Sequence, residues 1–207
     1  ACAPYRRLHL CHHNLETIET KSTAKHDLLA EVCMAAYYEG DLIKTHYLKH
    51  EQTNNDSASQ LCTVLARSFA DIGDIVRGRD LYLGNPEEIK QRQQLDKKLK
   101  DIFAKIYEGL SRTRTKNGQT LQERYKGDPE FFQLREDWWT ENRETVWKAL
   151  TCEVGGGTYF RKTCNDTGQG PSQTHNKCRC DGSNADQVPT YFDYVPQFLR
   201  WFEEWAE

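Results

Sequence analysis

The residues best suited to chemistry lie in one late stretch of this 207-residue chain: Cys164, His175, Cys178 and Cys180. Thiolates and imidazoles are the usual ligands of tetrahedral zinc, so this group could hold a zinc ion. Its spacing argues against that, because a Cys-x-Cys pair is uncommon in zinc knuckles and no second paired set follows. A loop tied by disulfides is the favoured interpretation, and no metal or cofactor is expected.

Other reactive side chains match no catalytic pattern. His12 and His13 are adjacent, and His46, His50 and Glu51 lack the one-face spacing of a His-Glu-x-x-His helix. Solvated histidines are the favoured interpretation. The chain also lacks a Gly-x-Ser-x-Gly motif. We therefore expect no catalytic residues.

Basic side chains could instead bind an anionic ligand through charge-assisted hydrogen bonds. They gather in three places: Lys44 with Lys49, then Arg112, Arg114 and Lys116, then Arg161 with Lys162. A sulfated glycan is the ligand that such patches would suit. For any single patch, an ordinary solvated surface is the competing interpretation. Sequons at Asn55 and Asn165 mark surface loops, whether or not they are glycosylated.

Composition narrows the function classes. The net charge of −3 argues against a dedicated nucleic-acid binder, which normally carries a basic excess. Eight cysteines in a polar chain favour an oxidising, extracellular setting. The apolar runs are too short and too interrupted by charge to span a membrane. Both ends look cut, so signals and anchors of a full protein could lie outside the sequence.

The elements that must position these residues are helices. Apolar residues recur three and four positions apart along residues 61–78, which predicts an amphipathic helix with Cys62 at the edge of its apolar face. Gly73 within it suggests close approach by a neighbouring helix. Asn85-Pro86 is a strong start signal for the next helix. The other predicted helices cover residues 26–38, ended by Gly40, then 41–50, 86–109, 130–150, and a last one opened by Asp193 and Pro196.

The segments around these helices complete the prediction. Phe198, Trp201, Phe202 and Trp205 are expected to form the apolar face of the last helix. Residues 151–189 are too long for an ordinary connector, so they must be pinned by disulfides, mobile or functional. The predicted fold is all-α, a disulfide-stapled helical bundle with long loops.

Two segments resemble a known family: LARSFADIGDIVRG at residues 65–78 and PTYFDYVPQFLRWFEEW at residues 189–205. They are similar to the alpha type of Duffy-binding-like domain in Plasmodium erythrocyte membrane protein 1. The segments APYRRLHLC at 3–11, LLAEVC at 28–33 and WKALTC at 147–152 fit the same family, so the resemblance extends over essentially the whole chain.

The resemblance implies a variant adhesin on the extracellular face of the infected erythrocyte membrane, anchored only through regions outside this sequence. Its implied partners are a host cell-surface receptor or sulfated glycan, and antibodies. The alternative is a non-adhesive scaffold or immune-decoy module that supports a neighbouring cysteine-rich binding domain. The resemblance also implies that residues 1–25 end a loop-rich first subdomain, that residues 26–207 form a helical second subdomain, and that a third is absent.

The same resemblance implies a disulfide between Cys62 and Cys152. Such a bond would close a loop of about 90 residues and contribute about 4 to 5 kcal/mol in the chain-entropy model. Cys2 and Cys11 are then expected to pair upstream of the sequence, and one of the late cysteines beyond its end. The expected disulfide cysteines within the helical part are Cys62, Cys152, Cys164, Cys178 and Cys180.

Overall fold

The structure is a computed structural model that describes residues 2–11, 15, 18, 24–54, 58–110, 120–154, 162–164, 172–174, 177–182, 185 and 187–206. The helices are α1 (Tyr5–Leu8), α2 (Ala24–Asn54), α3 (Ala58–Arg77), α4 (Pro86–Glu108), α5 (Leu121–Arg124), α6 (Phe132–Leu150), the 3₁₀ helix η2 (Phe192–Tyr194) and α7 (Gln197–Ala206). No described residue lies in a β-strand. The all-α fold with disulfides is therefore confirmed.

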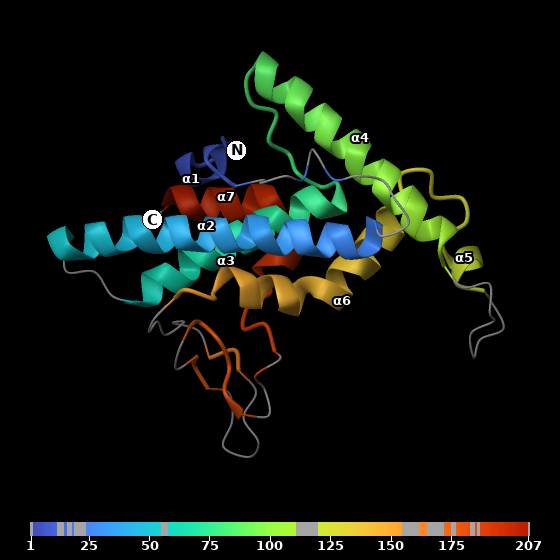
Figure 1. Cartoon of the computed structure of the whole chain (residues 1–207). Helices are drawn as coiled ribbons and strands as arrows, with labels where there is room; N and C mark the ends of the chain where they lie inside the picture. Colours follow the sequence, from blue (N-terminus) through green and yellow to red (C-terminus); the bar gives the residue numbers. More distant parts are fainter. Residues whose placement is uncertain are drawn as a thin grey trace.

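Helix α3 is the centre of the molecule, with α2, α6, η2 and α7 packed around it (Figure 1). The sequence pattern predicts one buried apolar face. The structure buries the polar side as well, including Asp71, Asp74 and Arg77. Tertiary contacts on several sides outweigh the amphipathic pattern, because neighbouring elements supply ion-pair partners for the charged residues.

Helix α2 runs without a break for 31 residues, so the prediction that Gly40 ends a helix is wrong. Gly40 is buried in mid-helix, and a Cβ atom there would overlap the carbonyl oxygen of Leu150 at the end of α6. The glycine is needed for close approach of two helices rather than for a turn. Gly73 has the predicted role, since a Cβ there would lie 2.8 Å from the indole of Trp139.

Helix α4 has the predicted start. The Asn85 side chain accepts hydrogen bonds from the backbone nitrogens of Glu87 and Glu88, and the Glu88 carboxylate accepts one from the Asn85 nitrogen, which completes a capping box. The helix leans away from the bundle, and its N-terminal end extends beyond the other helices (Figure 1).

Helix α6 begins at Phe132, two residues later than the proline signal predicts. Phe131 adopts the left-handed conformation with φ of 56°, which interrupts the helical path between Pro129 and Phe132. The Asp128 carboxylate then accepts a hydrogen bond from the Gln133 nitrogen at 2.8 Å. The Asp128 side chain therefore still accepts a hydrogen bond from the first turn of α6, although a turn separates Asp128 from the helix.

The apolar core is built on aromatic contacts between α3 and α6. The ring of Phe69 lies 5.1 Å from the rings of both Trp139 and Trp147, and all three side chains are buried. None of the described helices combines the length and the apolar character needed to cross a membrane.

Candidate functional site

The late cysteines pair differently from the expected scheme. A disulfide joins Cys62 on α3 to Cys178, 116 residues further on, and a second joins Cys164 to Cys180. The expected Cys62–Cys152 bond is therefore wrong. Cys152 is exposed and forms no disulfide within the described part of the chain.

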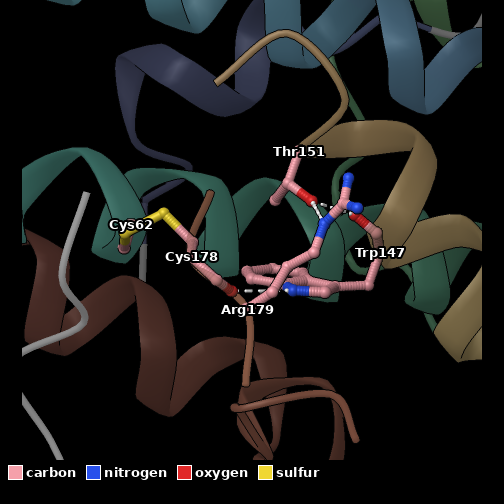
Figure 2. The surroundings of a disulfide bond; sticks show 5 residues. All are labelled: Cys62, Trp147, Thr151, Cys178 and Arg179. Carbon is pink, nitrogen blue, oxygen red and sulfur yellow. Dashed lines mark hydrogen bonds between the residues drawn. A yellow bond between two sulfur atoms is a disulfide. The ribbon is translucent and has the colours of Figure 1, made fainter. Parts of the chain in front are cut away.

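Contacts around α6 explain why Cys178 is the partner of Cys62 (Figure 2). Arg179 donates from Nε to Thr151 Oγ1 and from Nη2 to the Lys148 carbonyl, both at 2.7 Å. Trp147 Nε1 donates to the Cys178 carbonyl at 3.0 Å. These bonds hold residues 178–179 against the C-terminal end of α6, and the disulfide to Cys62 links the same segment to α3.

This pairing also involves three of the four candidate zinc ligands. Cys164, Cys178 and Cys180 are all in disulfides, so they have no thiolate to offer a metal. His175 lies outside the described residues. Among the residues that can be searched, no three ligand-type side chains gather into a metal site.

Of the predicted basic residues, only Lys44 and Lys162 have side chains in the described part of the chain. Lys44 is half-buried on α2, and Lys162 is exposed beside the Cys164–Cys180 disulfide. Lys49 lies near the end of α2, but its side chain is outside the described part. The remaining predicted positions, Arg112, Arg114, Lys116 and Arg161, also lie outside it, as do His12, His13, Asn55 and Asn165. The three patches remain predictions.

A buried network of charged side chains surrounds α3, and the sequence analysis does not predict it. Arg200 of α7 donates to Asp71 at 2.7 Å and also pairs with Asp74. Arg6 of α1 donates to Asp71 at 2.8 Å and pairs with Glu204 of α7 at 3.0 Å. Ion pairs therefore attach both the N-terminal segment and α7 to the central helix.

The network continues into η2 and α6. Asp193 accepts hydrogen bonds from Trp139 Nε1 at 2.9 Å and from Arg143 at 2.8 Å. Arg77 pairs with Asp74 at 2.8 Å and donates to the Asp193 carbonyl. The available sequence signal is a row of charges three residues apart, at Asp71, Asp74 and Arg77, inside a strongly apolar segment. Such a row indicates paired, buried charges rather than a solvated face.

Electrostatics favour the ionised form of Asp71 despite its burial. Burial alone would raise the pKa of the Asp71 carboxyl, but the positive charges of Arg6, Arg200 and Arg7 outweigh it and hold that pKa below its ordinary value. The network therefore stabilises the fold only while the Asp71 carboxylate is ionised. It is buried under α1 and α7, so we assign it no direct contact with a ligand.

A groove of about 340 Å³ lies between α4, the segment that follows α3, and the start of α6. Its floor is apolar, with Ile75, Leu95 and Leu99. The charged residues at its edge are already paired, Arg92 with Asp80 at 2.5 Å and Asp96 with Arg135 at 3.1 Å. Its chemistry suits contact with a protein or glycan surface better than acid–base catalysis.

The apolar residues of helix α7 are mostly on its exposed side. Of the four residues expected to form its apolar face, only Trp201 is buried, while Phe198, Phe202 and Trp205 are exposed. Its inward side is mainly polar because Gln197, Arg200 and Glu204 join the charge network. This correction could not come from helical periodicity, which locates an apolar stripe but not the direction in which it faces.

A family model and a curated relative both relate this chain to Duffy-binding proteins. The family model described as the Duffy binding domain matches residues 1–200. The Plasmodium knowlesi Duffy receptor beta form is 27% identical over 215 residues, which cover 99% of this chain and 14% of that protein.

Solved structures agree. The crystal structure of the NTS-DBL1(alpha-1) domain of Plasmodium falciparum membrane protein 1 from the varO strain is 44% identical, with a TM-score of 0.74, and the match covers 100% of this chain and 43% of that one. The ICAM-1-binding DBLbeta domain of the PfEMP1 IT4var13 is 34% identical, with a TM-score of 0.67, over 98% of this chain and 41% of that one. The chain therefore spans less than half the length of these matched structures.

Proposed function

Because the chain belongs to the Duffy binding domain family, we propose that it is part of a variant adhesin that binds a receptor or sulfated glycan on host cells. The observation that carries the proposal is the 44% identity, over the whole chain, to the NTS-DBL1(alpha-1) domain of Plasmodium falciparum membrane protein 1. The DBLbeta relative, at 34% identity, binds ICAM-1. We likewise propose that the protein is exposed on the extracellular face of the infected erythrocyte membrane and is a target of antibodies.

The proposal is supported by the contrast between helices held by internal contacts and a basic segment outside them. Disulfides and buried ion pairs fix α3, α6 and α7, and their residues are committed to internal partners. The basic segment 111–118, between α4 and α5, contains three of the predicted contact residues: Arg112, Arg114 and Lys116. Loops carried by a rigid scaffold can change sequence without loss of the fold, which suits an adhesin under antibody selection.

The charge distribution favours attraction of an anionic glycan by one basic segment rather than by the protein as a whole. The chain is net negative, so a polyanion is not attracted by the molecule as a whole. Lysines on α4 are offset by acids, since Lys105 pairs with Glu108 at 2.8 Å and Lys90 with Glu87 at 4.0 Å. Segment 111–118 contains no acidic residue, so it is the better anion site.

A cell-binding assay tests the adhesive role directly. The oxidised 207-residue chain, labelled at its amino groups to low stoichiometry, should bind host erythrocytes or endothelial cells saturably in flow cytometry. Unlabelled chain should compete. If the chain does not bind while a neighbouring cysteine-rich domain of the same adhesin does, the scaffold or decoy role replaces the adhesive one.

Heparin chromatography tests the glycan version separately. Retention should fall steeply as salt rises from about 0.05 to 0.5 M, because the interaction of exposed charges is screened within about 10 Å at 0.1 M. Absence of retention at low salt, or retention that salt does not change, would remove the sulfated glycan as a ligand and leave a protein receptor.

A further inference from the structure

Two arginines share one acid beside α4. Arg7 of α1 and Arg92 of α4 both pair with Oδ2 of Asp80, which lies in the segment between α3 and α4. Their guanidinium carbons lie 5.0 Å and 4.3 Å from the centre of the Tyr82 ring. The other oxygen of Asp80 accepts hydrogen bonds from the Gln197 side chain at 2.8 Å and from the Tyr82 nitrogen at 3.4 Å. Both oxygens of this carboxylate are therefore in use.

One carboxylate does not fully compensate two guanidinium groups. Burial and the nearby charge of Arg7 lower the pKa of Arg92, although Asp80 opposes this effect. Glu88 offsets part of the charge, but its carboxylate already completes the cap of α4 and accepts a hydrogen bond from Tyr82 Oη at 3.0 Å. Arg7 is 1% exposed, and the buried Nε groups of Arg7 and Arg92 have no hydrogen-bond partner among the described residues. Buried donors without an acceptor are costly, so the site favours a ligand that supplies one.

The two arginines line a small hollow that adjoins the apolar groove along α4. The hollow has a volume of about 70 Å³, and its walls include Leu8 and Leu95 as well as Arg7 and Arg92. The groove of about 340 Å³ shares Ile75, Arg92 and Leu95 with the hollow. Arg92 therefore lies where the two spaces meet, and one ligand can occupy both.

The size and lining of the two spaces indicate the chemistry of the occupant. The hollow can hold one small acceptor group such as a carboxylate. The groove can hold a large apolar side chain, and the exposed side chains of Leu83 and Phe132 at its edge would add to that contact. A polyanion fits less well, because Glu88 and Asp96 at the edges repel further negative charge. A single carboxylate beside an apolar group is typical of a protein segment rather than of a sulfated sugar.

We propose that the hollow and the adjoining groove together bind a segment of a partner protein in which an Asp or Glu lies next to a large apolar side chain. The carboxylate supplies the acceptor that the guanidinium groups of Arg7 and Arg92 lack, and the apolar side chain covers Ile75 and Leu95. This protein-binding site does not include the basic segment 111–118. The inference rests on the proposed function only in taking the partner to be a host-cell protein, since the binding itself is measured without cells.

The test uses capped dipeptides as probes of this chemistry. N-acetyl-Glu-Phe-amide is compared with N-acetyl-Gln-Phe-amide, which lacks the charge, and with N-acetyl-Glu-Ala-amide, which lacks the large apolar side chain. Saturation-transfer NMR follows binding of each probe to the oxidised 207-residue chain. We expect the Glu-Phe probe to bind in the millimolar range and the other two to bind at least about fivefold more weakly, because each lacks one of the two contacts.

Two pairs of variants locate the binding. Arg92→Gln removes the shared guanidinium, and its control Arg124→Gln removes an arginine outside the groove that also pairs with an aspartate, at 2.7 Å, and lies against a tyrosine ring. Gln93→Trp places an indole in the groove, while Gln94→Trp changes the next exposed residue of α4, which does not line it. We expect Arg92→Gln and Gln93→Trp to weaken binding of the Glu-Phe probe by roughly fivefold or more, and the controls to change it by less than about twofold.

The Gln93 and Gln94 variants decide the result if Arg92→Gln, which also loses its pair with Asp80, does not fold. Equal binding of the Glu-Phe and Gln-Phe probes, no binding at about 10 mM probe, or equal effects of the two tryptophan variants would overturn the proposal. If a sulfated heparin disaccharide displaces the Glu-Phe probe and itself loses binding with Gln93→Trp, the groove belongs to a glycan instead. Attachment to cells is measured separately, so this site can fail while the adhesive role stands.

Discussion

At the scale of single residues, Gly40 makes a sharp stability prediction. Its missing side chain lets the backbone of α6 touch α2, and a methyl group there would overlap the Leu150 carbonyl oxygen. Backbone atoms at a helix end cannot move aside cheaply, so Gly40→Ala should destabilise the fold by about 1 to 3 kcal/mol in urea unfolding. Gly109→Ala is the control, since a Cβ there meets other atoms only at 3.5 Å. Equal midpoints for the two variants would contradict the close helix contact.

Asp71 makes the second residue-scale prediction. It joins Arg6 and Arg200 in a buried site, and Asp71→Asn would leave both cations without their shared anion. Breaking such a pair typically costs about 3 to 5 kcal/mol. The control Glu87→Gln, whose pair with Lys90 is exposed and 4.0 Å long, should cost less than about 1 kcal/mol. Chemical unfolding at pH 7 would compare them.

The pH dependence follows from the same carboxyl. The pKa of Asp71 is lower in the folded protein than its ordinary value of 3.8, so the folded state favours the ionised form. This contribution is present above pH 3.8 and is lost as the pH falls through the folded-state pKa. Asp71→Asn should therefore lose less stability than the parent protein on acidification below about pH 4. Parallel stability curves for the two proteins in that range would show that Asp71 is not the titrating group.

At the scale of elements, the disulfides predict an order of stability effects. The Cys62–Cys178 bond spans 116 residues and the Cys164–Cys180 bond spans 16. In the chain-entropy model the first contributes about 4 to 5 kcal/mol and the second about 3 kcal/mol. We therefore expect Cys62→Ala with Cys178→Ala to lower the unfolding midpoint more than Cys164→Ala with Cys180→Ala.

Cys152 is the element-scale control. Cys152 lies just after the end of α6 and is exposed, so Cys152→Ser should leave the unfolding midpoint unchanged. Peptide mapping by mass spectrometry of the non-reduced protein should recover a peptide linked through Cys62 and Cys178. Recovery of a peptide linked through Cys62 and Cys152 would reverse the assignment.

At the scale of the whole molecule, the net-negative charge means that binding of an anionic ligand by the basic segment 111–118 should depend strongly on which basic residues are changed. Changing Arg112, Arg114 and Lys116 to Gln should elute the protein from heparin at clearly lower salt. Changing Lys90, Lys100 and Lys105 to Gln removes the same charge from residues that pair with Glu87, Glu130 and Glu108. Equal losses from both triple variants would indicate a general charge effect rather than a loop site.

Much of the fold could be predicted from sequence because local rules decide it. The Asn85-Pro86 cap starts α4 where expected, and the apolar periodicity of residues 61–78 marks α3. Family motifs at 65–78 and 189–205 indicated the kind of domain. The candidate binding segment 111–118 is proposed from composition alone, since a single sequence does not show which surface residues contact a ligand.

Local sequence patterns were enough to predict most of the helices, the cap of α4 and the family, because these depend on neighbours three or four residues apart and on motif identity. Tertiary structure alone decided that Cys178 rather than Cys152 meets Cys62, that Gly40 continues a helix, and that α7 faces outward. Each of these three features depends on contacts between segments that are distant in the sequence. Arg179 binds the end of α6, and the Leu150 carbonyl lies beside Gly40. The Asp71–Arg200 pair sets the direction in which α7 faces, against the preference of its aromatic residues for burial.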